Sequence, residues 1–304
     1  MSTIATILGA AALAVAIASA AVADRRHKRA RKRLDRLEHR DAELLTLLKA
    51  TAARALEPTQ IDTAAPVAFR SQFGEDILIL ELLGWPRQGS FVEVGGYDGL
   101  TNSVSSALEQ LGWQGLLVEP VPELFAKAKA SRPRARVVHA AVGKHGSKGT
   151  AKLRHFEGDA QSDERYDESS HLESTTNAPG TRRPPASTPA RTIDVPLTTL
   201  DDLLAGPLQA HTQRIDAASI DVEGHELDVL DGFDLDRFQP AVILVEDHTR
   251  SGRGPINHAL EPRGYVQVGW LAWNRVMVRR DREDVLARAR ALGMHPTPPA
   301  ANTP

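Results

Sequence analysis

A glycine-rich turn beside acidic residues is the first stretch of this 304-residue chain whose residue types and spacing could do chemistry. An apolar run at residues 90–94 leads into an E-x-G-x-x-x-G pattern made of Glu93, Val94, Gly95, Gly96, Tyr97, Asp98 and Gly99. Glycine lets a backbone adopt positive φ and approach a ligand closely. Because ligands collect at the carboxyl ends of parallel strands, the pattern predicts a ligand-binding turn. Such turns also join strands to helices where no ligand binds.

A second acid, Glu119, ends the apolar run 115–119, twenty-four residues after Gly95, and Pro120 follows it. A carboxylate there can accept hydrogen bonds from both hydroxyls of a ribose. Acidic side chains repel a pyrophosphate but suit amine and sulfonium groups, and the G-x-G-x-x-G spacing of dinucleotide sites is absent. The combination favours S-adenosylmethionine over NAD as cofactor. The alternative is that Glu119 merely precedes a helix.

A third group could accept a proton. Asp221, Glu223 and His225 follow the apolar run 218–221, and we expect Asp221 and Glu223 to lie on one side of an alternating strand. Either carboxylate could serve as a base, and His225 has the intrinsic pKa best suited to neutral pH. Alternatively, Glu223 caps the next helix, His225 is an exposed first-turn residue, and Asp221 orients the cofactor's amino group. The two acids rank above His225 as site residues.

A fourth group follows the apolar run 241–245 and contains Glu246, Asp247 and His248. With Asp221 these residues could form a hard-metal site, but such a cluster is more often the polar rim of a pocket. No metal is therefore predicted. The chain contains no cysteine, which excludes disulfides, zinc–thiolate centres and thiol nucleophiles, so proton abstraction must fall to carboxylates or histidine.

The elements that must position these residues are short apolar runs that alternate with helical patterns, which predicts a doubly wound α/β fold with a mostly parallel sheet. Residues 265–269 and 275–279 are expected to close the sheet as an antiparallel pair. The alternation breaks at 158–190, which is rich in polar residues and proline and is predicted to be a mobile loop, either a surface insertion or a lid. Its apolar flanks, 150–156 and 191–195, are expected to pair as a hairpin.

The amino terminus differs in charge from the rest of the chain. Residues 4–23 carry no charge, and twenty helical residues span about 30 Å, the thickness of a bilayer core. Residues 24–40 then carry a balance of +6, which leaves −8 for the remainder. By the positive-inside rule this predicts an uncleaved anchor with the body in the cytoplasm. A cleaved signal peptide with an A-x-A site at 21–23 and a buried Ala-rich helix are the alternatives.

Taken together, the motifs from Ser71 to Arg279 resemble the FkbM-type methyltransferases, a branch of the class I S-adenosylmethionine-dependent enzymes. The resemblance rests on the residues 71–76, 91–99, 118–120, 140–143, 199–203, 220–226 and 244–246. Departures are mild, since Glu93 and Gly96 stand where the family often has Asp and Ala, and His225 stands where a small residue is common.

The resemblance implies a Rossmann-like sheet of seven strands with the last one antiparallel, and O-methylation as the commonest activity. The residue pattern predicts a transmembrane anchor at 1–24, a basic stalk helix at 25–57, a linker at 58–68 and a helix with a Pro-rich tail at 283–304, and the resemblance implies a methyltransferase domain at 69–282. Cofactor-binding residues are then expected to be Glu93, Gly95, Gly96, Tyr97, Asp98, Gly99, Glu119, Pro120, Ala141 and Asp221. The cleft mouth is expected to contain Gln72, Glu75, Asp76, Glu246 and His248. Ser71 could alternatively cap the helix that follows it.

These expectations describe a membrane-tethered, cytoplasm-facing methyltransferase acting on a hydroxyl of a sugar, glycolipid or lipid-linked intermediate. The alternative is a non-catalytic membrane-associated scaffold that keeps the fold for binding. Nucleic acid is not an expected partner, because the basic block adjoins the apolar stretch and suits lipid better. The sequence leaves the acceptor and the oligomeric state open.

Overall fold

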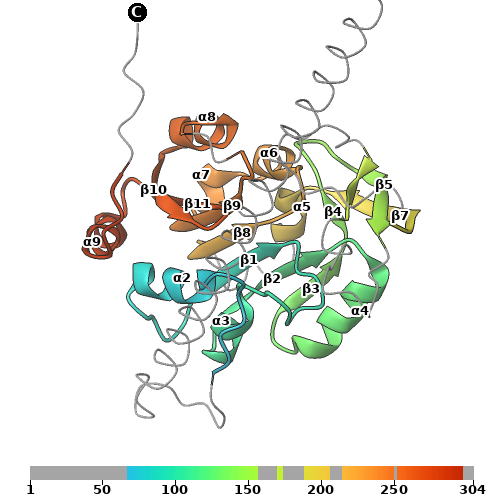
Figure 1. Cartoon of the computed structure of the whole chain (residues 1–304), viewed down its shortest axis with the longest axis horizontal. Coiled ribbons are helices and arrows are strands. Elements are labelled where there is room, and N and C mark those ends of the chain that lie inside the picture. Colours follow the sequence, from blue (N-terminus) through green and yellow to red (C-terminus); the bar gives the residue numbers. More distant parts are fainter. Residues whose placement is uncertain (1–66, 157–169, 174–187, 206–213, 250–251, 297–304) are drawn as a thin grey trace, which may run out of the picture. The chain divides into compact units, whose positions relative to one another are not determined.

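The computed structural model describes residues 67–156, 170–173, 188–205, 214–249 and 252–296 (Figure 1). The chain divides into two units, 1–51 and 52–304, and all described residues belong to the second. The predicted anchor, the stalk helix and most of the linker lie outside the described residues, as do 157–169 and 174–187 of the loop region. In the described ranges, no helix has the length and apolar character needed to cross a bilayer.

A seven-stranded sheet forms the centre of the unit, in the order β10-β11-β9-β8-β1-β2-β3. Strands β9, β8, β1, β2 and β3 are mutually parallel, and β11 runs antiparallel to both of its neighbours. The predicted mostly parallel sheet with a closing antiparallel pair is therefore confirmed. The strands are β1 Ser90–Val94, β2 Gln114–Glu119, β3 Arg136–His139, β8 Ala217–Ile220, β9 Val242–Glu246, β10 Tyr265–Leu271 and β11 Asn274–Arg279.

Helices cover both faces of this sheet, as its apolar strands require (Figure 1). On one face, the side chains of α5, α6, α7 and α8 form a core with Val92 and Val94 of β1. On the other face, α2, α3 and α9 pack around Phe91 and Trp113. The helices are α2 Glu75–Leu83, α3 Ser106–Gln110, α4 Pro122–Ser131, α5 Leu200–Leu204, α6 Glu226–Asp231, α7 Leu235–Phe238, α8 Pro255–Leu260, the 3-10 turn η4 Glu261–Arg263 and α9 Glu283–Ala291.

A smaller four-stranded sheet lies beside the main one, in the order β4-β7-β5-β6. Its strands are β4 Ala141–Val142, β5 Gly149–Phe156, β6 His171–Leu172 and β7 Ala190–Thr198. The pairing of β5 with β7 is antiparallel from Gly149↔Leu197 to Phe156↔Ala190, which confirms the predicted hairpin. Strand β6 was not predicted: it lies inside the expected loop and pairs with β5 through Leu153↔Leu172.

The strand order explains where a ligand can bind. Strand β1 is flanked by β2 on one side and by β8 on the other. The chain continues from β1 to β2 and β3 on the first side, and later returns to form β8 and β9 on the second, so the strand order reverses at β1. Such a switch point leaves a crevice beyond the carboxyl ends of the strands. Val94, Glu119, Ile220 and Glu246 are the last residues of β1, β2, β8 and β9, so the sheet brings all four predicted groups to one edge.

Candidate functional site

A pocket of about 1360 Å³, counted with the space at its open mouth, lies at this edge. Four segments beyond the ends of β1, β2, β8 and β9 contribute to it, together with β6 and the turn between β10 and β11. Of the predicted residues, those that line it are Gln72, Glu75, Glu93, Gly95, Gly96, Tyr97, Glu119, Pro120, Ala141, Asp221, Glu223, His225 and Glu246.

The glycine turn brings the end of β1 directly against the end of β8. Gly95 has φ 89°, and a Cβ built on it would lie 1.8 Å from the carbonyl oxygen of Asp221. The N–H groups of Gly95 and Gly96 both donate to the Val118 carbonyl at 3.0 Å. Only glycine fits position 95, because both the backbone conformation and the close approach exclude a side chain.

Glu119 joins this turn to the end of β2. Its carboxyl group is buried and accepts the N–H of Tyr97 and the N–H of Val121, each at 2.8 Å. Burial raises the pKa of Glu119 to about 8, against the effect of these two hydrogen bonds. A carboxylate offers about four acceptor positions, so two remain for the hydroxyls of a ribose. Together with the close glycine turn, the residues fit an adenosyl cofactor.

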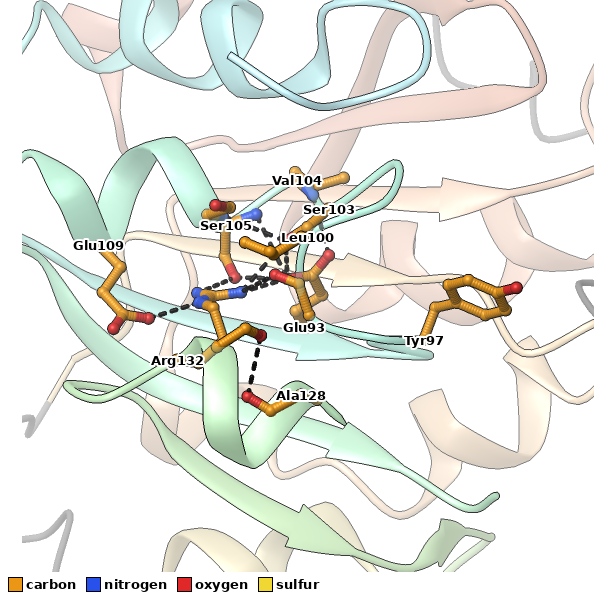
Figure 2. A network of polar contacts seen from close by, with 12 residues as sticks. Glu93, Tyr97, Leu100, Ser103, Val104, Ser105, Glu109, Ala128 and Arg132 are labelled. Carbon is orange, nitrogen blue, oxygen red and sulfur yellow. Dashed lines mark hydrogen bonds and ion pairs between the residues drawn. The ribbon is translucent and has the colours of Figure 1, made fainter. Parts of the chain in front are cut away.

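Glu93 lines the pocket, but its carboxylate is bonded to protein groups that were not predicted. Its carboxylate accepts the Val104 N–H at 2.8 Å and the Ser103 hydroxyl at 3.0 Å, and it also accepts from Ser105 (Figure 2). The guanidinium group of Arg132 lies 3.7 Å away. The acid is thus engaged by the segment after the turn. The bonds from Ser103 and Ser105 fix the chain just before α3, which begins at Ser106.

Asp98 and Gly99 are not among the residues that line the pocket. The Asp98 carboxylate accepts the N–H groups of Leu100 and Thr101 at 2.9 and 2.7 Å and the Thr101 hydroxyl at 2.8 Å. Burial pushes the pKa of Asp98 upward, but these hydrogen bonds outweigh it and leave the pKa below its usual value. Both residues shape the turn, and their predicted contact with the cofactor stays a prediction.

The acids after β8 do not alternate along a strand as predicted. Strand β8 ends at Ile220, and the Asp221 N–H donates to the Val94 carbonyl at 3.0 Å. Glu223 then has φ 53° and Gly224 has φ 103°, so the chain turns here. Both acids nevertheless line the pocket, because the turn rather than strand alternation directs them.

Asp221 is exposed to the pocket, and its carboxyl group lies close enough to Glu246 of β9 for each to affect the pKa of the other. Desolvation by the surrounding protein and the neighbouring Glu246 raise the pKa of Asp221 well above the usual value. Burial, followed by the charge of Glu223, raises the pKa of Glu246 to about 8. At neutral pH this pair therefore retains a proton.

His225 is buried at the first turn of α6 and lines the pocket, so it is not the exposed residue of the alternative hypothesis. Burial lowers its pKa, while Asp228, whose Oδ2 lies 3.9 Å from Nδ1, acts in the opposite direction. Glu226, not Glu223, supports the helix start, since it accepts the N–H groups of Val222 and Gly224 at 3.3 and 2.9 Å.

The cleft mouth contains Gln72 and Glu75 but not Asp76. Asp76 is fully buried and accepts the Arg70 N–H at 2.9 Å and the Ser71 hydroxyl at 2.5 Å. Its role is structural, which corrects the prediction. Gly74 occupies the N-cap position of α2, although the Ser71 hydroxyl accepts the Asp76 N–H at 3.3 Å.

His248 also lies outside the pocket lining, packed against Trp273 with ring centroids 5.5 Å apart, so it was wrongly placed at the mouth. Its Nε2 is 2.9 Å from Glu246 Oε1. Ligand atoms of Glu223, Glu246 and His248 all lie within 4.8 Å of one another and could hold a metal ion. Asp247 does not join them, because its carboxylate pairs with the buried Arg275.

Several pocket residues were missed by the sequence analysis. His171 and Leu172 form the unpredicted strand β6 and Ser170 precedes it, whereas Trp273 lies in the turn before β11 and Asn274 is the first residue of β11. The Asn274 amide donates to Glu75 at 3.0 Å across the mouth. The available signals were Leu172, an apolar residue between polar stretches, and Trp273, an aromatic residue in a hairpin turn.

No curated protein sequence matches the chain. Similar solved structures include a TehB-like SAM-dependent methyltransferase from Corynebacterium glutamicum, with 12% identity, TM-score 0.35, and coverage of 69% of this chain and 89% of that one. An O-methyltransferase from Bacillus cereus has 11% identity, TM-score 0.34, and coverage of 78% and 88%.

The model of the methyltransferase FkbM domain matches residues 93–267, more than half of the chain. The matched region begins at the acid before the glycine turn and ends in β10, so it includes the ends of β1, β2, β8 and β9 that form the pocket. The chain belongs to the FkbM methyltransferase family, whose cofactor is S-adenosylmethionine.

Proposed function

We propose that this S-adenosylmethionine-dependent methyltransferase methylates a hydroxyl group, and that the acceptor is a sugar, a glycolipid or a lipid-linked intermediate at the cytoplasmic face of a membrane. The cofactor supplies a methyl group bound to a sulfonium sulfur. Transfer to a hydroxyl needs an acceptor oxygen in line with that methyl group and a side chain that takes the proton.

The observation that carries the proposal is that His225 lines the same pocket as Glu119 and the glycine turn. Gly95 and Gly96 let the turn pack closely against Asp221 and Leu117 at the edge of the pocket, and Glu119 has acceptor capacity left for the ribose of the cofactor. At the other end, a buried imidazole with a lowered pKa is neutral at physiological pH and can accept the hydroxyl proton. The pKa values of Asp221 and Glu246 are both raised, so these acids are better suited to hydrogen-bonding the acceptor or the cofactor's amino group than to acting as the base. Glu223 is the remaining carboxylate that could assist.

Sequence features support the membrane part of the proposal. The uncharged residues 4–23 and the basic residues 25–33 would anchor the chain and pair with anionic headgroups, at about 1 kcal/mol per basic residue near the surface. An enzyme held there meets acceptors that are themselves bound to the membrane.

The test uses the purified full chain, S-adenosylmethionine labelled in the methyl group, and an extract of envelope lipids and glycans as acceptor. We expect label in a product that resists the mild base used to cleave methyl esters, because a methyl ether does. His225→Ala should remove transfer while cofactor binding remains. Label found only in base-labile or N-methyl products would overturn hydroxyl methylation, and cofactor binding without any transfer would favour the scaffold alternative.

A further inference from the structure

The wall of the cofactor pocket next to the glycine turn is a segment without regular structure. Between Gly95 and Ser105 the chain contains neither helix nor strand, and positive φ values occur at Gly95, Tyr97, Gly99 and Asn102. Residues 101–104 of this segment line the pocket. A chain with so many left-handed residues does not support itself, so contacts from elsewhere must fix its conformation.

Arg132, the residue that follows α4, provides three of these contacts (Figure 2). Its Nη1 donates to the Gly99 carbonyl at 3.2 Å and to the Ser103 hydroxyl at 3.1 Å, and its Nη2 donates to the Ser105 hydroxyl at 2.8 Å. Its Nε donates to Glu109 of α3. Arg132 is 3% exposed, so the charge is buried and every contact is shielded from bulk water.

Glu93, which lies beside Arg132, also forms hydrogen bonds with this segment. Figure 2 shows Arg132 between Glu93 and Glu109, with Ser103 and Ser105 above them. The Glu93 carboxylate accepts the N–H groups of Val104 and Ser105 at 2.8 and 3.2 Å. Two N–H groups of the segment are therefore bonded to Glu93 of β1. Two of its hydroxyls and the Gly99 carbonyl are bonded to Arg132 at the end of α4.

Close packing at the end of α4 adds to these bonds. Ser131, the last residue of α4, donates its hydroxyl to the Asp98 carbonyl at 3.0 Å. A Cβ at Gly99 would lie 2.7 Å from Ser131 Oγ and 2.9 Å from Arg132 Cγ. The segment fits against α4 only because position 99 is glycine, so the position of Arg132 and that of the pocket wall are linked.

We infer that Arg132 is a positioning residue for the cofactor pocket: although it does not line the pocket, it fixes the wall formed by residues 101–104. A guanidinium group can make this set of contacts because its donors form a planar fork, which the single ammonium group of lysine cannot reproduce. The inference rests on cofactor binding in this pocket and does not depend on the acceptor.

The first test compares Arg132→Lys with wild type in the full chain, by calorimetric titration with S-adenosylmethionine and by hydrogen–deuterium exchange of the peptide covering 98–105. Arg132→Lys keeps the charge but loses the fork, so we expect affinity to fall about tenfold or more and exchange of this peptide to quicken. Arg275→Lys is the matched control, since Arg275 is also buried but bonds Asp247, Asn257 and Gln267. It should lower stability and leave exchange at 98–105 unchanged.

A second variant covers the case in which Arg132→Lys does not fold. Ser105→Ala removes one hydroxyl that bridges Arg132 and Glu93, does not alter a pocket-lining residue, and leaves all charges in place. It should also weaken cofactor binding and speed exchange at 98–105, by less than Arg132→Lys. Folded variants that bind and exchange like wild type would overturn the positioning role alone. Failure of the wild-type chain to bind the cofactor would instead refute the proposed function.

Discussion

The N–H of Tyr97 donates to the Glu119 carboxyl group at 2.8 Å, which fastens the turn after β1 to the end of β2. Glu119→Gln keeps the size of the side chain but removes the charge that two ribose hydroxyls would share at pH 9, where Glu119 is ionised. A hydrogen bond to a charged group contributes about 1.5–3 kcal/mol, so we expect cofactor affinity to fall by about tenfold or more. Calorimetric titration measures this, with Glu75→Gln as the control at the pocket mouth. Equal affinities for Glu119→Gln and wild type would remove Glu119 from the cofactor site.

The raised pKa of Glu119 predicts how cofactor binding depends on pH. With a pKa of about 8 in the folded chain, Glu119 is largely protonated at pH 7 and ionised at pH 9. A carboxylate accepts from a ribose diol better than a carboxylic acid does, so binding favours the ionised form. Affinity should therefore increase from pH 7 to pH 9, by up to about tenfold per pH unit below the pKa. Titrations across this range should show the increase in wild type, and a similar slope in Glu119→Gln would contradict the assignment.

The close approach of Gly95 to Asp221 predicts a large loss of stability in Gly95→Ala. The new methyl group would overlap the Asp221 carbonyl oxygen, and the residue would also keep a positive φ. We expect the free energy of unfolding to fall by more than about 3 kcal/mol, or the fold to be lost. Gly146→Ala is the matched control, because it has φ 78° with no atom within 4 Å of the added Cβ, and should cost only about 1 kcal/mol. Denaturant unfolding measures both, and equal losses would show that the contact with Asp221 has no effect.

Asp76 should matter for stability and not for cofactor binding. Asp76→Ala leaves the buried N–H groups of Arg70 and Ser71 and the Ser71 hydroxyl without their acceptor. Buried donors left without a partner cost about 1–3 kcal/mol each, so the unfolding midpoint should fall clearly. Under conditions where the variant is folded, its cofactor affinity should equal that of wild type. A selective loss of affinity would restore Asp76 to the cleft mouth.

The membrane anchor predicted at 1–24 can be tested by fractionation. The full chain should sediment with membranes and resist extraction with high salt, whereas a chain lacking residues 1–24 should be released by salt, because only screened contacts of the basic residues remain. Recovery of both chains in the soluble fraction would exclude the anchor.

The arrangement of strands was predictable because each buried strand is an apolar run between turns, and the pairing of β5 with β7 followed from two apolar flanks. The roles of individual acids were harder to predict. Glu93 and Glu119 both end apolar runs, but the partner of Glu93 is Arg132, thirty-nine residues later, and sequence spacing does not reveal such a contact. The expected alternation of Asp221 and Glu223 along a strand was wrong, because β8 ends one residue earlier than expected and the chain then takes a left-handed turn. Both acids line the pocket all the same.

The hairpin of β5 and β7 has a practical consequence for altering this enzyme. Phe156 and Ala190 face each other as the last pair of the hairpin, so both ends of the intervening segment are fixed next to one another outside the seven-stranded sheet. That segment includes His171 and Leu172, which line the pocket, whereas the glycine turn and Glu119 belong to the main sheet. An exchange of residues 157–189 with the same segment of a homologue would therefore replace His171 and Leu172 in the pocket lining and leave the glycine turn and Glu119 in place.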